Sequence, residues 1–340
     1  MKRKFLIIFA VAAVGLTAVF FAAKSCFDGD DLIAEEKFQN VPTGTGIRPV
    51  VLPGKKPVAT KREKPQTDNF YVFDLNTNIF VGNSPETLDI IDVNGSQSAI
   101  SPDGKNIACI FQKPAPSCVY VYNIKEKQGR ILKFPVDLPV SNPVFAPDGK
   151  FLAAVMTTPS SSRIAVYDLE KDTFKTVYKD MSYYFSPAFS PEGSLLTFHD
   201  MQKVYIYGFN GFSLKLLKTV DCGNFCMDNA TGIAENCKFQ TLEDTVKILY
   251  TYNCYLDTVI TSTVLACYDI KTEKIKNISG NGKFCTDFQA SLNSNVYFLL
   301  QNSSDSTAES FLYMTELSAG KPVRVSERSF EPPCSFSVSF

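Results

Sequence analysis

The sequence predicts an all-β fold: a six-bladed β-propeller preceded by an N-terminal hydrophobic helix and a disordered linker. Three observations lead to this prediction. A short turn phrase occurs three times, an aromatic strand pattern occurs six times at the same period, and one long uncharged run lies near the N-terminus. Repeats with a period of about 40 to 50 residues are typical of arrays of small sheets.

The turn phrase combines proline, an acidic residue and glycine. Proline pre-sets φ, the acidic side chain bonds the backbone that follows it, and glycine adopts positive φ without a steric cost. The prolines are 45 and 44 residues apart, and apolar residues flank each copy. We therefore expect nine structural residues in three strand-to-strand turns. They are Pro102, Asp103 and Gly104, then Pro147, Asp148 and Gly149, then Pro191, Glu192 and Gly193.

An aromatic strand that ends in a polar residue follows each turn phrase and recurs where the phrase is absent. Six copies within residues 69–340 correspond to about 45 residues each, which agrees with the spacing of the prolines. Short strands at even spacing, rich in Tyr, Phe, Val and Ile, are typical of a radial all-β array. We expect each copy to be the third strand of a blade. The copies are residues 119–123, 164–168, 204–208, 264–269, 311–316 and 70–74.

The two ends of residues 69–340 are expected to share one blade, because a closed ring protects the edges of its sheets. Residues 70–74 and 79–81 would supply two strands, and residues 335–340 would supply the first strand. The sequence shows no clear second strand for this blade. It therefore leaves open a three-stranded last blade or a truncated reading frame.

The phrase F-[SA]-P-[DE]-G followed by an apolar strand resembles the repeat of TolB-like β-propellers, which are WD-type relatives. The resemblance is clear in residues 96–208 and degenerate in the other repeats. It implies six blades, and propellers of this kind occur in periplasmic scaffolds, in gating domains of peptidases and in lactonases. TolB proteins are periplasmic partners of an envelope lipoprotein and carry an α/β domain before the propeller. Residues 27–68 could not form such a domain.

The N-terminal segment, residues 1–26, has the pattern of an export signal. Residues 2–4 are basic, residues 5–23 are an uncharged run of 19, and Lys24 follows. This length is closer to a membrane-spanning helix than to a signal-peptide core. We expect residues 5–23 to anchor the chain in the inner membrane, with the propeller on the periplasmic or extracytoplasmic side. The alternatives are a cleaved signal peptide with secretion, and a lipoprotein modified at Cys26.

Residues 27–68 are expected to form a disordered, Pro/Lys-rich linker between this anchor and the propeller at residues 69–340. An acidic first part is followed by a second part dense in proline and lysine. Such a composition cannot bury enough apolar surface to fold. The net charge of −1 gives no indication of nucleic-acid binding, so no nucleic-acid partner is expected.

Ten cysteines in an exported chain predict disulfides, although the pairing does not follow from the sequence. When the repeats are aligned on their first strands, three of them have a cysteine near the mouth of the central channel. In two of the three, an aspartate follows two residues after the cysteine. Residues two apart on a strand share a face. The candidate ligands of a soft-metal or redox site are therefore Cys226, Cys285, Cys334, Asp228 and Asp287. Disulfides between blades, or small buried thiols, would explain the same residues.

Catalytic motifs are mostly lacking in the sequence. The single histidine, His199, ends the second strand of a repeat, and there is no G-x-S-x-G nucleophile motif. We expect His199 at a loop edge, no catalytic residue and no cofactor.

The function that these features favour is an exported, membrane-tethered binding or scaffold propeller with a protein partner in the cell envelope. One alternative is a propeller enzyme, a lactonase or other hydrolase, with its site in the central channel. The other is a thiol-based metal or redox protein.

Overall fold

The computed structural model describes residues 71–339, apart from 76–77, 112–116, 136–137, 180–181, 227–230, 235–236, 243–246, 281, 292–293, 306–307, 318–320 and 331–333. Strands dominate these residues, and the one helix among them is a short 3-10 helix, η1 (Cys222–Phe225). The predicted all-β class is therefore confirmed. No helix in this part of the chain has the length and apolar character needed to cross a membrane. The predicted anchor at residues 5–23 and the linker at 27–68 lie outside the described residues.

The described strands form five hydrogen-bonded sheets, and four of these contain four antiparallel strands each. In pairing order, the first contains β25 (Cys334–Val338), β1 (Tyr71–Leu75), β2 (Asn78–Ser84) and β3 (Thr87–Asn94). The second contains β4 (Ser96–Ile100), β5 (Asn106–Phe111), β6 (Cys118–Asn123) and β7 (Gln128–Ile131). The third contains β8 (Val140–Phe145), β9 (Phe151–Thr157), β10 (Ser162–Asp168) and β11 (Thr173–Lys179). The fourth contains β12 (Phe185–Phe189), β13 (Leu195–His199), β14 (Lys203–Asn210) and β15 (Ser213–Asp221).

The fifth sheet has nine strands and two antiparallel halves. One half contains β17 (Gln240–Leu242), β18 (Lys247–Leu256), β19 (Val259–Asp269) and β20 (Lys274–Asn277), with β16 (Thr231–Ile233) also paired to β18. The other contains β21 (Phe284–Ala290), β22 (Asn295–Gln301), β23 (Ser310–Glu316) and β24 (Val323–Phe330). A single parallel pair, Thr263 opposite Phe284, joins the halves.

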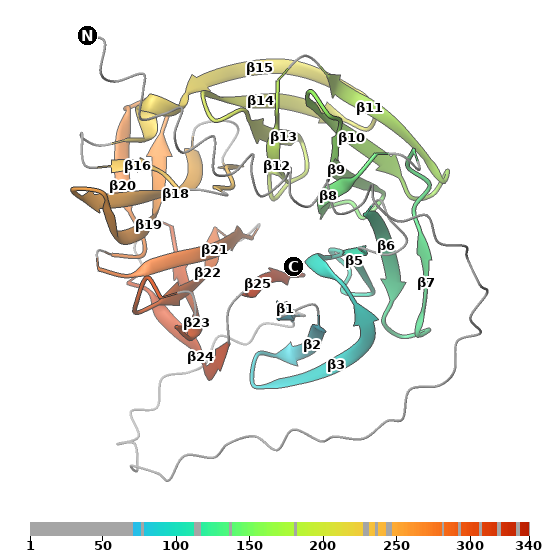
Figure 1. Cartoon of the computed structure of the whole chain (residues 1–340), viewed down its shortest axis with the longest axis horizontal. Coiled ribbons are helices and arrows are strands. Elements are labelled where there is room, and N and C mark those ends of the chain that lie inside the picture. The colour runs from blue at the N-terminus through green and yellow to red at the C-terminus, as the bar shows by residue number, and fades with distance from the viewer. Residues whose placement is uncertain are drawn as a thin grey trace, which may run out of the picture. The chain divides into compact units, whose positions relative to one another are not determined.

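The strands that line the centre come from every sheet (Figure 1). β4 contacts β8 and β25, β12 contacts β8 and β17, and β21 contacts β25. The Ala290 N–H of β21 also bonds the Gln240 side chain of β17. Because these contacts connect neighbouring inner strands in chain order, the sheets are arranged around a common axis. We call β4, β8, β12, β17, β21 and β25 the inner strands.

The three turn phrases each connect an inner strand to the second strand of its sheet. In each turn the backbone N–H of the glycine donates to the carbonyl oxygen three residues earlier at 2.9 Å. The glycine φ angles are 69°, 70° and 78° at Gly104, Gly149 and Gly193. Glycine is favoured there because other L-residues are strained at positive φ.

Replacing Gly193 with alanine is expected to destabilise the fold by about 1 to 2 kcal/mol. An added Cβ would lie 3.2 Å from Cδ of Pro147, in the turn of the preceding sheet, in addition to the backbone strain. Urea denaturation of the full chain would measure the change. The control is Gly223→Ala, where an added Cβ meets no atom within 4 Å; an equal loss in both variants would contradict this account.

The predicted third strands are correct in five copies and wrong in the sixth. β6, β10 and β14 are third in their sheets, and β19 and β23 are third in the two halves of the nine-stranded sheet. In contrast, β1, predicted as a third strand, pairs directly with the inner strand β25. β2 is the third strand and β3 the fourth, so this sheet has four strands rather than three. The pattern is ambiguous because second and third strands are both rich in β-branched, aliphatic and aromatic residues, so their composition does not tell them apart.

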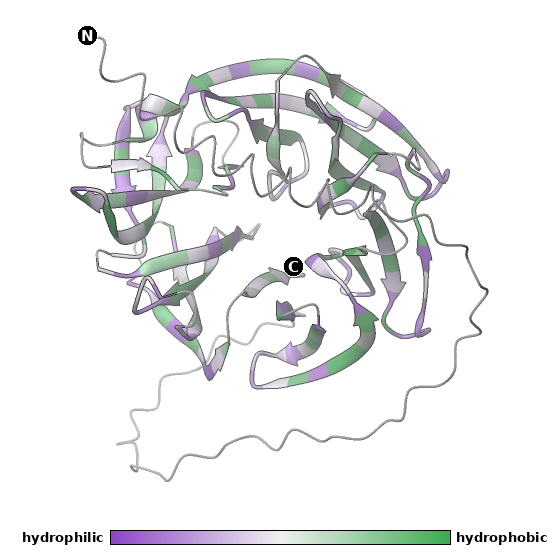
Figure 2. Cartoon of the chain, viewed as in Figure 1, coloured by the Kyte–Doolittle hydropathy of each residue, from purple (hydrophilic) through white to green (hydrophobic). Residues whose placement is uncertain are grey.

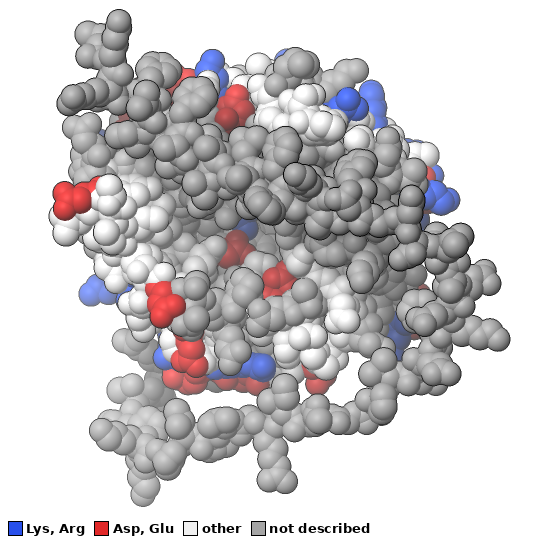
Figure 3. Space-filling view, in the orientation of Figure 1, with Lys and Arg blue, Asp and Glu red and all other residues white. Residues whose placement is uncertain are grey.

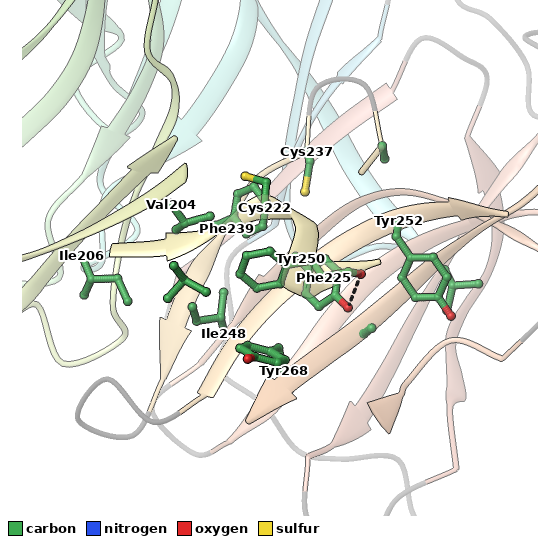
Figure 4. Close-up of a cluster of buried hydrophobic side chains, with 14 of the residues drawn as sticks. Val204, Ile206, Cys222, Phe225, Cys237, Phe239, Ile248, Tyr250, Tyr252 and Tyr268 are labelled. Carbon is green, nitrogen blue, oxygen red and sulfur yellow. Dashed lines mark hydrogen bonds between the residues drawn. The ribbon is translucent and has the colours of Figure 1, made fainter. Parts of the chain in front are cut away.

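Hydrophobic side chains are distributed along the strands of every sheet (Figure 2), and they pack between neighbouring sheets. The cluster between the β12–β15 sheet and the β17–β20 half is centred on Phe225 of η1 (Figure 4). Its ring centroid lies 5.0 Å from that of Phe239 and 4.7 Å from that of Tyr250. The Tyr250 hydroxyl donates to the Phe225 carbonyl oxygen at 3.0 Å. A buried tyrosine hydroxyl is thereby satisfied.

Candidate binding site in the central cavity

A cavity of about 340 Å³ lies at the centre of the sheets and is lined by residues of all six inner strands. Pro102, Pro147 and Pro191 of the three turn phrases belong to its wall. Figure 3 shows charged side chains at the recessed centre of the face that it draws. A concave site with few polar groups at fixed positions is where a propeller of this kind would hold a ligand.

Three residues at equivalent positions line the cavity in a left-handed backbone conformation. Gln97, Asn142 and Ser186 have φ of 53°, 51° and 47°. Each lies at a β-bulge, where the register between the inner strand and the second strand shifts. A bulge bends the strand and redirects a side chain, and non-glycine residues at positive φ are concentrated at functional sites.

Side chains in the cavity wall link each inner strand to the next. The Gln240 amide donates to the Phe189 carbonyl oxygen at 3.3 Å and accepts from the Ala290 N–H at 2.8 Å. The Gln289 amide makes the same two kinds of bond to the backbone of Val338, both at 2.9 Å. An inner strand pairs with a second strand on one edge only, so the backbone groups on its other edge need other partners. The two glutamine amides supply hydrogen bonds to such groups. These bonds make the cavity wall rigid.

Two further bonds extend this pattern on the other side of the cavity. The Asn142 N–H donates to Oε1 of Gln97 at 2.7 Å, and the Ile100 N–H donates to the Ser337 hydroxyl at 3.1 Å. The side chain of one inner strand again meets the backbone of the next.

One ion pair lies in the cavity wall. Nζ of Lys238 is 3.0 Å from Oδ1 of Asp287, and both side chains are largely buried. The second carboxylate oxygen accepts from the Phe336 N–H at 3.1 Å, and the Lys238 ammonium lies 5.0 Å from the centroid of the Phe288 ring. Lys238 and Asp287 neutralise each other, so the cavity presents no uncompensated charge from this pair.

A second carboxylate, Asp74, is buried beside the same strands. It accepts from the Ser98 N–H at 2.6 Å and from the Ser335 hydroxyl at 2.7 Å. Burial is the main cause that raises the pKa of Asp74 above its usual value, and these hydrogen bonds act in the opposite direction. Asp74 thus joins β1, β4 and β25 rather than facing solvent.

Some cavity groups make no side-chain hydrogen bond within the described part of the chain: the Asn142 amide, the Ser186 hydroxyl and the Thr286 hydroxyl. All three residues line the cavity. They offer uncharged donors and acceptors to a ligand. The sequence did not single them out as binding residues, although Asn142 and Ser186 occupy the same position, five residues before the proline of their turn phrase.

The structure places the predicted metal ligands in different surroundings. Cys285 and Asp287 lie on β21, and Cys334 begins β25, although its side chain is not described. Cys226 follows η1 and is not on an inner strand, so its alignment with the other two cysteines is wrong. Asp228 lies outside the described residues. The connection before β17 is longer than in the other repeats, and this shifted the alignment.

The described residues contain no group of three or more His, Cys, Asp or Glu side chains that could hold a metal ion. Burial raises the pKa of the Cys285 thiol, which disfavours the thiolate that a soft metal would bind. The metal site remains a prediction, because two of its five residues lie beyond the side chains described.

The predicted disulfides are not formed among the cysteines whose side chains are described. Burial raises the pKa of the Cys237 thiol to about 12, so this sulfur behaves as a small buried apolar group. Among the side chains described, free thiols are present at Cys109, Cys118, Cys222, Cys237, Cys254 and Cys285.

His199 is buried at the end of β13, where the sequence predicted a loop edge. Nε2 lies 2.8 Å from the Cys237 carbonyl oxygen, and the Met201 N–H donates to Nδ1 at 3.3 Å. This arrangement requires a neutral ring with its proton on Nε2. Burial lowers the pKa of His199 to about 4. The histidine is a structural link to the segment before β17.

No protein-family model and no curated protein matches this sequence. Among solved structures, TolB from Acinetobacter baumannii is similar, with a TM-score of 0.56 and 15% identity over 79% of this chain and 66% of that chain. The present chain thus spans slightly less than two thirds of that protein. A putative TolB from Agrobacterium tumefaciens has a TM-score of 0.52 and 12% identity, over 80% of this chain and 97% of that one.

An acylaminoacyl peptidase from Pyrococcus horikoshii is also similar, with a TM-score of 0.48 and 13% identity over 78% of this chain and 51% of that chain. At these identities, the likeness to the two TolB structures concerns the fold alone. The chain has a TolB-like β-propeller fold, as its turn phrase predicted.

Proposed function

We propose that this chain is a six-bladed, exported propeller that binds a protein partner in the cell envelope. The count of six treats the nine-stranded sheet as two blades. Each half is an antiparallel meander with its own inner strand, and one residue pair joins them. Residues 69–340 would form the propeller, and residues 27–68 would be its linker.

The proposed location is extracytoplasmic. The basic start and the uncharged run at residues 5–23 support export, with the propeller on the outer side of the inner membrane. An uncleaved helix would tether the chain, whereas cleavage would release it.

The observation that carries the binding function is the cavity with its unused polar groups. The inner strands are held to one another by side-chain bonds, so the Asn142 amide and the Ser186 and Thr286 hydroxyls are positioned on a rigid wall. Preorganised groups lose little entropy on binding. A scaffold of this kind carries its function in exposed groups rather than in the fold.

The test is in-cell crosslinking of the full chain, followed by purification and identification of the bound envelope protein. Asn142→Arg places a long charged side chain in the cavity and is expected to reduce recovery of that protein at least tenfold. The matched control is Ser213→Arg on the outer strand β15, which is expected to leave recovery unchanged. Equal recovery with both variants would contradict a cavity site.

The hydrolase alternative has its own test. Turnover of lactones or esters by the wild type that is lost in Asn142→Arg would favour that alternative.

A further inference from the structure

The β18–β19 hairpin extends beyond the rest of its sheet. β18 has 10 residues and β19 has 11. In the three sheets that contain a turn phrase, the second and third strands have 5 to 8 residues. Pairing continues to the end of the hairpin, where Leu256 is opposite Val259. The extra length is therefore ordered strand, not loop.

A third strand supports the extension. Residues 222–239 separate β15 from β17, and within them β16 pairs with β18, placing Thr231 opposite Cys254. Side chains also link the two long strands. The Thr263 hydroxyl donates to the Asn253 amide oxygen at 2.7 Å, and the Thr261 hydroxyl donates to the Cys254 carbonyl oxygen at 3.2 Å. The hairpin is thus held in one geometry before any partner arrives.

The end of the hairpin exposes apolar side chains. We call Leu256, Val259 and Ile260 the apolar tip; Leu256 is 68% exposed and Val259 is 63% exposed. Asp257, between them, is the only charged residue from 248 to 268. Exposed apolar groups gathered at one point of a surface mark interaction sites.

The neighbouring sheet adds apolar groups at the same end of the strands. Tyr183, Phe185 and Met201 are exposed there. The end of β13 lies beside the second half of β18. His199, the last residue of β13, bonds the carbonyl oxygen of Cys237, and the Thr251 N–H of β18 donates to the sulfur of the same cysteine. The turns after β13 and β18 both join a second strand to a third. The tip and these three side chains therefore face the same side of the molecule.

We infer that the apolar tip docks into a partner protein that presents an apolar pocket with a lysine or arginine at its base. The charge pattern selects this occupant: three apolar side chains fill the pocket, and the single carboxylate at the apex meets the cation. This docking surface goes beyond the proposed cavity site and is separate from it.

Two other occupants fit this charge pattern less well. Insertion into a lipid surface would drive the Asp257 carboxylate first into the apolar layer, where a charge is unfavourable, and an anionic headgroup layer would repel it. A symmetric tip-to-tip pair of two copies of this chain would place two Asp257 carboxylates together.

The experiment introduces the photo-crosslinking residue p-benzoylphenylalanine at position 256 of the full chain, in cells of the source organism. The control carries it at position 216, where an exposed leucine lies on the outer strand β15. The expected result is one discrete protein adduct at 256 and none at 216, with the crosslinked peptide containing apolar residues and a lysine or arginine. The identified partner is then purified. Asp257→Lys is expected to weaken its binding to the full chain at least tenfold, while Asp257→Glu stays within threefold.

Four results would overturn the inference. One is an adduct of the chain with itself. Another is cosedimentation of the wild type with phosphatidylcholine–phosphatidylglycerol vesicles that Leu256→Ser abolishes. The third is the lack of any adduct at 256, and the fourth is equal binding of the partner by Asp257→Lys and wild type. Asn142→Arg separates this inference from the cavity site, because that variant is expected to keep the 256 adduct. All tip substitutions replace exposed residues, so unchanged thermal melting would show that the fold is intact.

Discussion

Phe225→Ala is expected to lower the free energy of unfolding by about 3 to 5 kcal/mol. The Phe225 side chain is fully buried between two sheets, and three aromatic rings surround it. Removing the ring leaves a cavity that these rigid neighbours cannot close, which adds to the loss of buried apolar area. Urea denaturation followed by circular dichroism would measure the change.

The matched control is Leu217→Ala on the outer strand β15, whose side chain is about half exposed. Its cost is expected to stay within about 0.5 kcal/mol. A loss below about 1 kcal/mol for Phe225→Ala would mean that η1 does not hold the two sheets together, because a fully buried ring cannot be removed so cheaply. The backbone bond from Tyr250 remains in the variant, so the comparison isolates the ring.

Acidification from pH 6.5 to pH 4 is expected to remove on the order of 3 kcal/mol of stability through His199 alone. Burial lowers the pKa of His199 from 6.5 to about 4 in the folded chain. Between these values the unfolded chain binds the proton and the folded chain does not. Stability from this group is therefore complete above pH 6.5, decreases as the pH falls, and changes no further below pH 4.

His199→Gln isolates this contribution, because carboxylates titrate in the same range in both chains. The glutamine amide can still donate to the Cys237 carbonyl oxygen, which His199 approaches to 2.8 Å. The difference in stability between wild type and variant is expected to shrink steadily from pH 7 to pH 4, as measured by urea denaturation at each pH. A constant difference across this range would contradict the prediction, because it would mean that folding does not lower the pKa of His199.

The turns and the bulges of the inner strands differ in how far the sequence predicts them. The turn phrases located the inner strands correctly in three repeats, because a proline, an acid and a glycine act on their own backbone. The bulge five residues earlier carries no local mark of this kind, since Gln97, Asn142 and Ser186 share no side-chain chemistry. Their common feature is the positive φ, which the pairing with the second strand imposes.

The ion pair between Lys238 and Asp287 could not be found from the sequence either. The two residues are 49 positions apart and belong to different repeats. Asp287 was identified only as a possible metal ligand beside a cysteine. In the fold it bonds a lysine and two backbone N–H groups, because β21, β25 and the residues just before β17 converge on it.

Local chemistry alone decided the all-β class, the period of the repeats and the positions of the turns. These depend on φ preferences and on the two-residue alternation of strands, both of which act over a few neighbouring residues. Tertiary structure decided which strand β1 pairs with, that His199 is buried, and that β18 and β19 extend as an exposed hairpin. Asp74 bonds Ser335 across 261 residues. Such contacts depend on how distant segments pack, and a single segment carries no record of its partner.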